Sequence, residues 1–182
     1  PELKEKDYDN TLLSRGPSAR LSAEMIRDNA LRSSNLLNTE IGGESVKPYQ
    51  PKGLWLISGK AKYDQSTGED LYRRSLYTIW KRTLPPPSMN TFDAPDRSYC
   101  IVKREKTSTP LQSLVLLNDP QFVEASRALA SKAIQSQETV EMRITHIFRS
   151  LTSHFPTDKE LKVLLKFYQK QSLDFKDQRS KM

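Results

Sequence analysis

The sequence predicts a mainly α fold: a multi-helix domain that carries a small antiparallel β-ribbon and long irregular connections. Three observations predict this fold class. Apolar residues recur at helical spacing between residues 109 and 168. Glycine gathers in the first half of the chain, where residues 41–70 hold five of the six glycines. Two short stretches between these regions are rich in aromatic and β-branched residues, which favour strands.

The N-terminal part begins with an irregular segment that leads into a helix. Residues 1–18 are charged and contain the Gly16-Pro17 break, which predicts a loop or a weak lead-in element. The first clear helix is predicted over residues 21–37, with Ser22 as the N-cap and Glu24 favourably placed in the first turn. Gly42 and Gly43 then stop this helix.

The middle of the chain predicts a long connection and a β-ribbon. Residues 41–70 form the connection, and loops of this length are commonly functional or wrapped on another surface. Residues 71–83 predict a strand that ends at a run of prolines, although a helix fits the periodicity nearly as well. Residues 98–104 predict a second strand, which would pair with the first as the antiparallel ribbon.

Four helices are predicted from Thr109 onward. The first follows Ser108 or Thr109 as its cap and has Pro110 at its first position. Asp119 and Pro120 repeat this pattern for the second helix, and the third spans residues 138–153. The fourth opens at Thr157 and Glu160, the spacing of a capping box, and runs through Tyr168.

Composition limits the classes of function. The single cysteine, Cys100, excludes an internal disulfide and also a haem attachment motif, which needs paired cysteines. The longest apolar runs are far shorter than the roughly 20 residues that cross a bilayer, so no transmembrane segment is predicted. Only 36% of the residues are hydrophobic, and the chain begins at Pro1 without an initiator methionine or an export signal. We therefore expect a fragment that rests on structure not included here.

The charge pattern argues against a nucleic-acid site, and the histidine spacing argues against a metal site. The net charge of +7 comes mainly from residues 41–110, which hold 12 basic and 7 acidic side chains and so contribute +5. Arg74 and its neighbours alternate with aromatics there, but a strand would divide this patch between its two faces, so nucleic acid is disfavoured as a partner. His146 and His154 lie eight residues apart without a carboxylate at i, i+4 spacing, so no metal site is predicted.

Residues 91–112 are the segment where we predict a site. They place Asp93 and Asp96 three residues apart, with basic and amide side chains beside a helix that starts near Thr109. Two carboxylates at this spacing are candidates for acid–base catalysis or for binding a hard cation. The candidate binding residues are Arg97, Arg104, Arg74 and Gln112. The alternative interpretation is structural: aspartate and arginine side chains cap the irregular loop and fix it through salt bridges.

Four long stretches together resemble a known family. They are RLSAEMIRDNAL, GGESVKPYQPKGLW, GEDLYRRSLYTIWKRTLPPPSMNTFDAPDR and TSTPLQSLVLLNDPQFVEASRALA, and they cover about residues 10–135. The family is the planctomycete PSD domain, the C-terminal domain of unknown function in large exported proteins that also carry a planctomycete cytochrome c domain. The resemblance implies export to the periplasm or the cell surface. It implies haem only in another domain of the parent protein, so no cofactor is expected in this fragment.

Residues 1–135 are therefore interpreted as the C-terminal part of a PSD-like domain, and residues 136–182 as a helical hairpin appended to it. The leading functional hypothesis is a helical accessory or scaffold domain, without activity of its own, whose partners are other domains of the same parent chain. One alternative is part of an enzyme that acts on an extracellular polysaccharide, with its Asp/Arg site at residues 91–112. Another is a module that binds a polyanion or nucleic acid.

Overall fold

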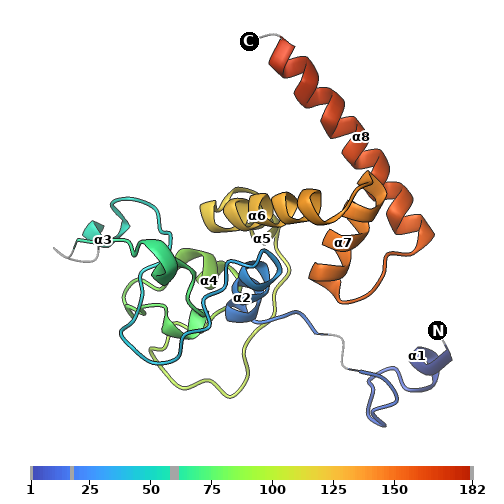
Figure 1. The fold of residues 1–182 in the computed structure, drawn as a ribbon. Coiled ribbons are helices and arrows are strands. Elements are labelled where there is room, and N and C mark those ends of the chain that lie inside the picture. Colours follow the sequence, from blue (N-terminus) through green and yellow to red (C-terminus); the bar gives the residue numbers. More distant parts are fainter. Residues whose placement is uncertain (1, 17–18, 58–61, 181–182) are drawn as a thin grey trace.

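The computed structural model of the protein describes residues 2–16, 19–57 and 62–180. Helices dominate it, which confirms the predicted mainly α class. Figure 1 shows a body built around α2 (Ala23–Ser33) and α6 (Pro120–Ser136), with α8 (Asp158–Ser180) projecting from it. The short α1 (Glu2–Lys6) lies at the opposite side of the view from α3 (Leu54–Ile57).

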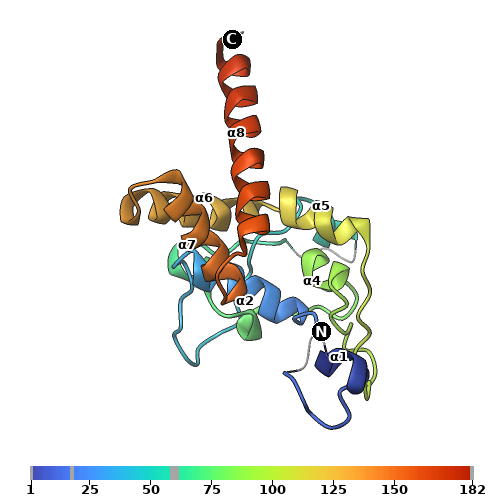
Figure 2. The ribbon, with the colours of Figure 1, turned by 90° about the vertical axis from the view of Figure 1, so that its right-hand side faces the viewer.

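The core lies where α2 packs against α6 and the short α4 (Pro87–Thr91), and α5 (Pro110–Asn118) packs against both α4 and α6. Phe92, at the end of α4, packs edge-on against Phe122 of α6, with ring centroids 6.4 Å apart. Ala23, Met89 and Ala94 complete this buried cluster. Figure 2 shows α4 and α5 side by side at one end of the body, and α7 (Val140–Thr152) at the other end.

Short polar caps define where the helices begin, as the sequence predicts. Ser22 caps α2 by accepting the N–H of Met25, and Asp119 caps α6 by accepting the N–H of Gln121. Thr157 and Glu160 form the predicted capping box of α8: the Thr157 N–H donates to Glu160 at 2.8 Å. The helix α2 ends at Ser33, before the predicted glycine stop, and α8 continues past Tyr168 to Ser180.

The predicted antiparallel β-ribbon is wrong. Residues 71–83 contain neither a strand nor a helix of the predicted length but two 3₁₀ turns, η1 (Gly68–Tyr72) and η2 (Ser75–Tyr77), with isolated bridges. Residues 98–104 form an exposed loop. The cause is the buried Arg27, whose guanidinium donates to the carbonyl oxygens of Leu71 at 3.0 Å and Arg73 at 2.8 Å. Side-chain donors from α2 thus satisfy backbone acceptors that a partner strand would otherwise pair.

The long connection, residues 41–70, is organised partly by Arg73. The buried Arg73 guanidinium donates to the backbone carbonyls of Glu44 at 3.0 Å and of Gly42, and it stacks on the Tyr77 ring at 4.1 Å. Gly43 has a positive φ of 80°, and an added Cβ would lie 3.3 Å from Arg73 Nη1. The connection is therefore wrapped closely around a buried cation. Its residues 58–61 lie outside the described part of the chain.

A helix that crosses a membrane must be both long and apolar. None of the helices within the described ranges is long and apolar enough to cross a membrane.

Candidate functional site

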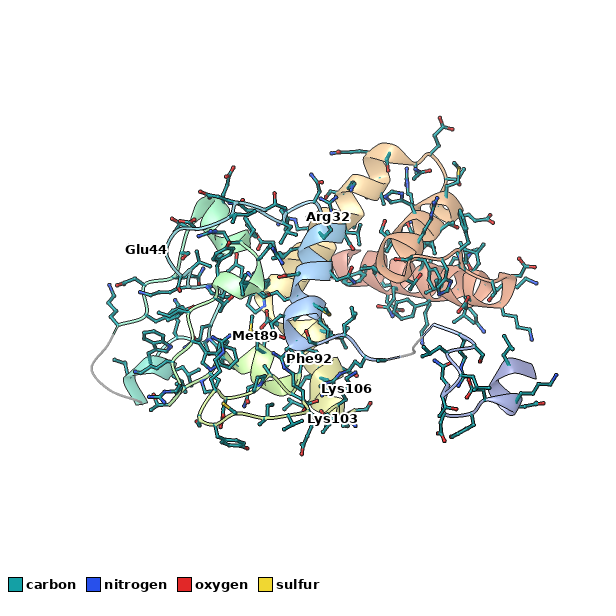
Figure 3. The ribbon with its side chains drawn as sticks, turned by 90° about the horizontal axis from the view of Figure 1, so that it is seen from below. Arg32, Glu44, Met89, Phe92, Lys103 and Lys106 are labelled. Atoms are coloured by element: carbon teal, nitrogen blue, oxygen red, sulfur yellow. The ribbon has the colours of Figure 1, made fainter. Side chains whose placement is uncertain are left out.

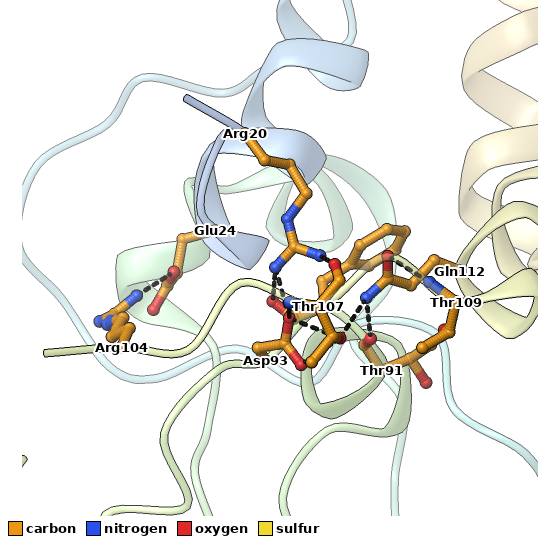
Figure 4. A network of polar contacts seen from close by, with 9 residues as sticks. Arg20, Glu24, Thr91, Asp93, Arg104, Thr107, Thr109 and Gln112 are labelled. Atoms are coloured by element: carbon orange, nitrogen blue, oxygen red, sulfur yellow. Dashed lines mark hydrogen bonds and ion pairs between the residues drawn. The ribbon is translucent and has the colours of Figure 1, made fainter. Parts of the chain in front are cut away.

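Asp93 lies at the centre of a polar network where α4 ends (Figure 4). Its backbone adopts a positive φ of 60°, which reverses the chain after Phe92. One carboxylate oxygen, Oδ2, accepts from Arg20 Nη2 at 2.5 Å and from the Thr107 N–H at 2.8 Å. The Thr107 hydroxyl donates to the other oxygen, Oδ1, also at 2.8 Å. Both oxygens of Asp93 are therefore engaged, by two segments that are distant in sequence.

Gln112 joins the same network from the first turn of α5. Its side-chain nitrogen, Nε2, donates to the carbonyl oxygen of Thr91 at 3.0 Å and to the Thr107 hydroxyl at 3.1 Å. Its side-chain oxygen accepts the N–H of Thr109 at 3.4 Å, as the N3 residue of a capping box does. Gln112 is buried, so it fixes the start of α5 against the end of α4.

These contacts keep Asp93 ionised. Burial raises the pKa of Asp93, but the hydrogen bonds from Thr107 and Arg20 lower it more, so the pKa lies below its usual value. A carboxylate with a lowered pKa and saturated oxygens is a poor proton donor near neutral pH. The arrangement suits an anchor that holds residues 91–109 in place better than it suits an acid–base catalyst.

We expect Asp93→Asn to destabilise the fold by about 1–2 kcal/mol at pH 7, because charge-assisted hydrogen bonds become neutral ones. Asparagine tolerates a positive φ, so the substitution tests the charge rather than the backbone. Because the folded pKa is lowered, the contribution of Asp93 is present above its unfolded pKa near 3.8 and is lost as the pH falls through the folded value. Urea unfolding of both proteins should show a stability gap that closes below about pH 4.

Asp96 and Arg97 form a separate turn. Asp96 Oδ1 accepts the N–H of Ser98 at 2.8 Å, and the Asp96 carbonyl accepts from Trp80 Nε1 at 3.0 Å. The Arg97 guanidinium stacks over the Trp80 ring at 4.4 Å. Asp93 and Asp96 are close in sequence, but each has its own partners, and the two carboxylates share none of these contacts.

The two other predicted arginines also lie apart from Asp93. Arg104 pairs with Glu24 of α2 at 2.8 Å and remains partly exposed. Arg74 is exposed at the start of η2, while its neighbour Arg73 is buried in the connection. Of the predicted residues, the structure thus joins only Asp93 and Gln112, and it does so through the Thr107 hydroxyl. The role of each as a catalytic or binding residue stays a prediction.

Sequence reasoning missed Arg20 and Thr107, which complete the network. Arg20 precedes α2 and is 73 residues from Asp93 in sequence, so no local spacing indicates the pair. Thr107 lies in the polar run before Pro110, where a helix cap is expected, but nothing local predicts its contact with Asp93. Among the described residues, no group of three or more His, Cys, Asp or Glu side chains is placed to hold a metal ion.

Comparison with protein families shows the family of the chain. The model of the family PSD1, a protein of unknown function (DUF1553), matches residues 1–168. The chain belongs to this family. Searches of curated proteins and of solved structures found no match to the chain. In this PSD1 chain the match includes α7 and reaches into α8, while the division into two units at residue 135 stays a prediction.

Proposed function

We propose that this PSD1 chain is an accessory domain that uses the outer face of α5 to pack against another domain of the same exported polypeptide. The observation that carries this proposal is the composition of α5. Five of its residues are large and aliphatic, and they are distributed around the helix: Leu111, Leu114, Val115, Leu116 and Leu117. A helix that is hydrophobic on all sides is normally buried on all sides.

Only one side of α5 is covered within the described part of the chain. Gln112 is buried, and Val115 packs against the core cluster. On the outer side, Leu111 and Leu114 are each 55% exposed, and Leu117 is 74% exposed. These three leucines are three residues apart, so they form one stripe along the helix. We call this stripe the α5 outer face.

The apolar surface continues from the α5 outer face into a groove. The groove has a volume of about 370 Å³, and its lining residues include Leu114, Pro51, Pro87, Pro120 and Tyr49. A contiguous apolar patch of this kind is typical of a protein interface. Because it joins a helix to the long connection, a partner would contact both elements at once.

The balance between the free energy of apolar burial and the entropic cost of association favours a partner within the same polypeptide. Complete burial of an exposed leucine contributes about 1.5–3 kcal/mol, so three half-exposed leucines provide only a modest driving force. Two separate molecules would lose much of this favourable free energy through the loss of translational and rotational entropy. A covalent link raises the effective concentration and removes most of this cost. The resemblance to exported multidomain proteins supports the same choice of partner.

The test measures binding of this chain to the remainder of its parent polypeptide, expressed separately. Because the covalent link is absent in this test, we expect the wild-type chain to bind only weakly, and the double variant Leu114→Asp, Leu117→Asp to show no measurable binding, since it loses two apolar contacts and buries two charges. Isothermal titration calorimetry reads the affinity. Ser131→Asp, on an exposed position of α6, is the control and should bind like the wild type.

Thermal unfolding separates docking from folding in this experiment. Because Leu114 and Leu117 are exposed, the double variant should unfold at nearly the temperature of the wild-type chain. Unchanged binding by a folded double variant would rule out the α5 outer face as the docking surface.

A further inference from the structure

A second surface, distinct from the α5 outer face, lies on residues 97–108, which we call the strap. Every residue of the strap is exposed. Figure 1 shows this segment, in yellow-green, as a long loop at the bottom of the view, on the side of the body away from α8. The strap joins the end of the Asp93 turn to the start of α5.

The strap combines an apolar tip with a basic stem. At the tip, Tyr99 is 72% exposed, Ile101 is 40% exposed, and Val102 is completely exposed. Lys103, Arg104 and Lys106 follow directly and, with Arg20, line an open groove of about 970 Å³. Figure 3 shows Lys103 and Lys106 close together at one edge of the body. Apolar and cationic side chains therefore face solvent side by side.

The charges of the groove are only partly neutralised. Arg20 pairs with Asp93 and Arg104 pairs with Glu24. Among the ion pairs of the described residues, none involves Lys103 or Lys106, and Glu105 is the one acidic residue that lines the groove. The two lysines thus offer free ammonium groups to an external anion.

The base of the strap is fixed although its tip is exposed. Thr107 donates hydrogen bonds to Asp93 through both its N–H and its hydroxyl. Arg104 forms an ion pair with Glu24 of α2 at 2.8 Å. These contacts hold the basic stem against the body on both sides of Lys106. A partner that binds there therefore meets a partly preformed surface and loses less entropy in ordering it.

We propose that the strap is a contact site for an anionic phospholipid surface. Lipid phosphates would contact Lys103, Lys106 and the exposed part of Arg104, while Tyr99, Ile101 and Val102 would insert at the boundary between headgroups and acyl chains. Basic side chains near apolar and aromatic ones are the pattern of segments that lie at such an interface. Tyrosine in particular is enriched at that depth.

The apolar tip favours a lipid surface over a soluble polyanion. A sulfated or carboxylated polymer would use the lysines but would leave Val102 and Ile101 in water. Nucleic acid binding commonly uses several aromatic side chains on which successive bases stack, and the strap has one aromatic residue, Tyr99. A membrane surface uses both parts of the strap.

The test is co-sedimentation of the full 182-residue chain with phospholipid vesicles. We expect binding to vesicles of equal parts phosphatidylcholine and phosphatidylglycerol, and much weaker binding to phosphatidylcholine alone. Each lysine near an anionic surface contributes about a fivefold increase in partition, so Lys103→Gln with Lys106→Gln should lower it about 25-fold. Ile101→Ser with Val102→Ser should lower it about tenfold.

Matched control variants show whether a loss of vesicle binding is specific to the strap. Lys132→Gln with Lys159→Gln changes the net charge equally at exposed positions on α6 and α8. Ile41→Ser with Leu76→Ser removes comparable exposed apolar groups, which are 85% and 68% exposed. Both control pairs should partition within about twofold of the wild type, because neither pair belongs to the strap.

Three results would overturn the proposal. The first is failure of the wild-type chain to bind anionic vesicles. The second is an equal loss of binding in a control pair, which would make the effect one of general composition. The third is wild-type partition by the Ile101→Ser, Val102→Ser pair, which would identify the strap as a site for soluble polyanions. Dextran sulfate and a single-stranded oligonucleotide, tested in parallel, would then show which polyanion it prefers.

Discussion

Arg27→Met is expected to lower the free energy of unfolding by about 3–5 kcal/mol, the range for breaking a buried and fully bonded charge network. Arg27 is 3% exposed, and its guanidinium donates to Gln121 at 2.6 Å and to the Ser75 hydroxyl at 3.2 Å as well as to two backbone carbonyls. Methionine fills a similar volume but leaves these buried acceptors without a donor. Each unsatisfied acceptor costs about 1–3 kcal/mol.

A lysine at position 27 should recover only part of this loss. Burial lowers the pKa of Arg27 to about 10, although the charges of Asp28 and Asp119 oppose the shift, so the side chain stays charged at neutral pH. The ammonium group of lysine retains the charge but cannot contact α6 and both 3₁₀ turns at once. Urea unfolding of the Met and Lys variants measures both effects. Arg32→Met, at an exposed position of the same helix, should cost less than about 1 kcal/mol.

If Arg27→Met unfolds at the urea concentration of the Arg32→Met control, the network does not hold the irregular connection to the helices. The description of residues 71–77 as a segment fixed by side chains of α2 would then be wrong.

Leu31→Ala is expected to cost about 3–4 kcal/mol, within the range measured for truncating a buried leucine. Among the described residues, Leu31 is the largest side chain with almost no exposure, at 0%, and it lies in α2, a helix that packs against α6, α7 and η2. Alanine would leave a cavity there, because neighbouring helices relax only partly. Its better helix propensity offsets only a few tenths of a kcal/mol.

Chemical denaturation with circular dichroism detection checks the Leu31→Ala value. Leu76→Ala is the control, because Leu76 is 68% exposed and its truncation should change stability by less than about 0.5 kcal/mol. A similar small effect at both positions would contradict the packing described for α2.

The parts of the fold that the sequence predicted depend on local interactions. Ser22, Asp119 and the Thr157–Glu160 pair each cap a helix through contacts within three residues, so their spacing alone reveals them. The helices after Thr109 follow the apolar periodicity for the same reason. The position of each helix end was less predictable: α2 ends at Ser33, well before Gly42, because Asn35 adopts a positive φ of 64° and the Leu36 N–H donates back to the carbonyl of Leu31 at 2.9 Å.

The parts that the sequence did not predict depend on distant contacts. Residues 71–83 have the composition of a strand. Their conformation instead depends on Arg27, which is hydrogen-bonded to Gln121, 94 residues away in sequence. The candidate site shows the same limit. Asp93 and Gln112 lie in one predicted segment and both bond Thr107, whereas the contact between Asp93 and Arg20 joins segments that no pattern relates.

The most direct test of the account is hydroxyl-radical footprinting of the parent protein and of this chain alone, read by mass spectrometry. Leu111, Leu114 and Leu117 should be oxidised in the isolated chain, where each is more than half exposed, and strongly protected in the parent. Leu76 serves as an internal reference. Equal oxidation of the three leucines in both samples would contradict the claim that α5 is the docking helix of this PSD1 chain.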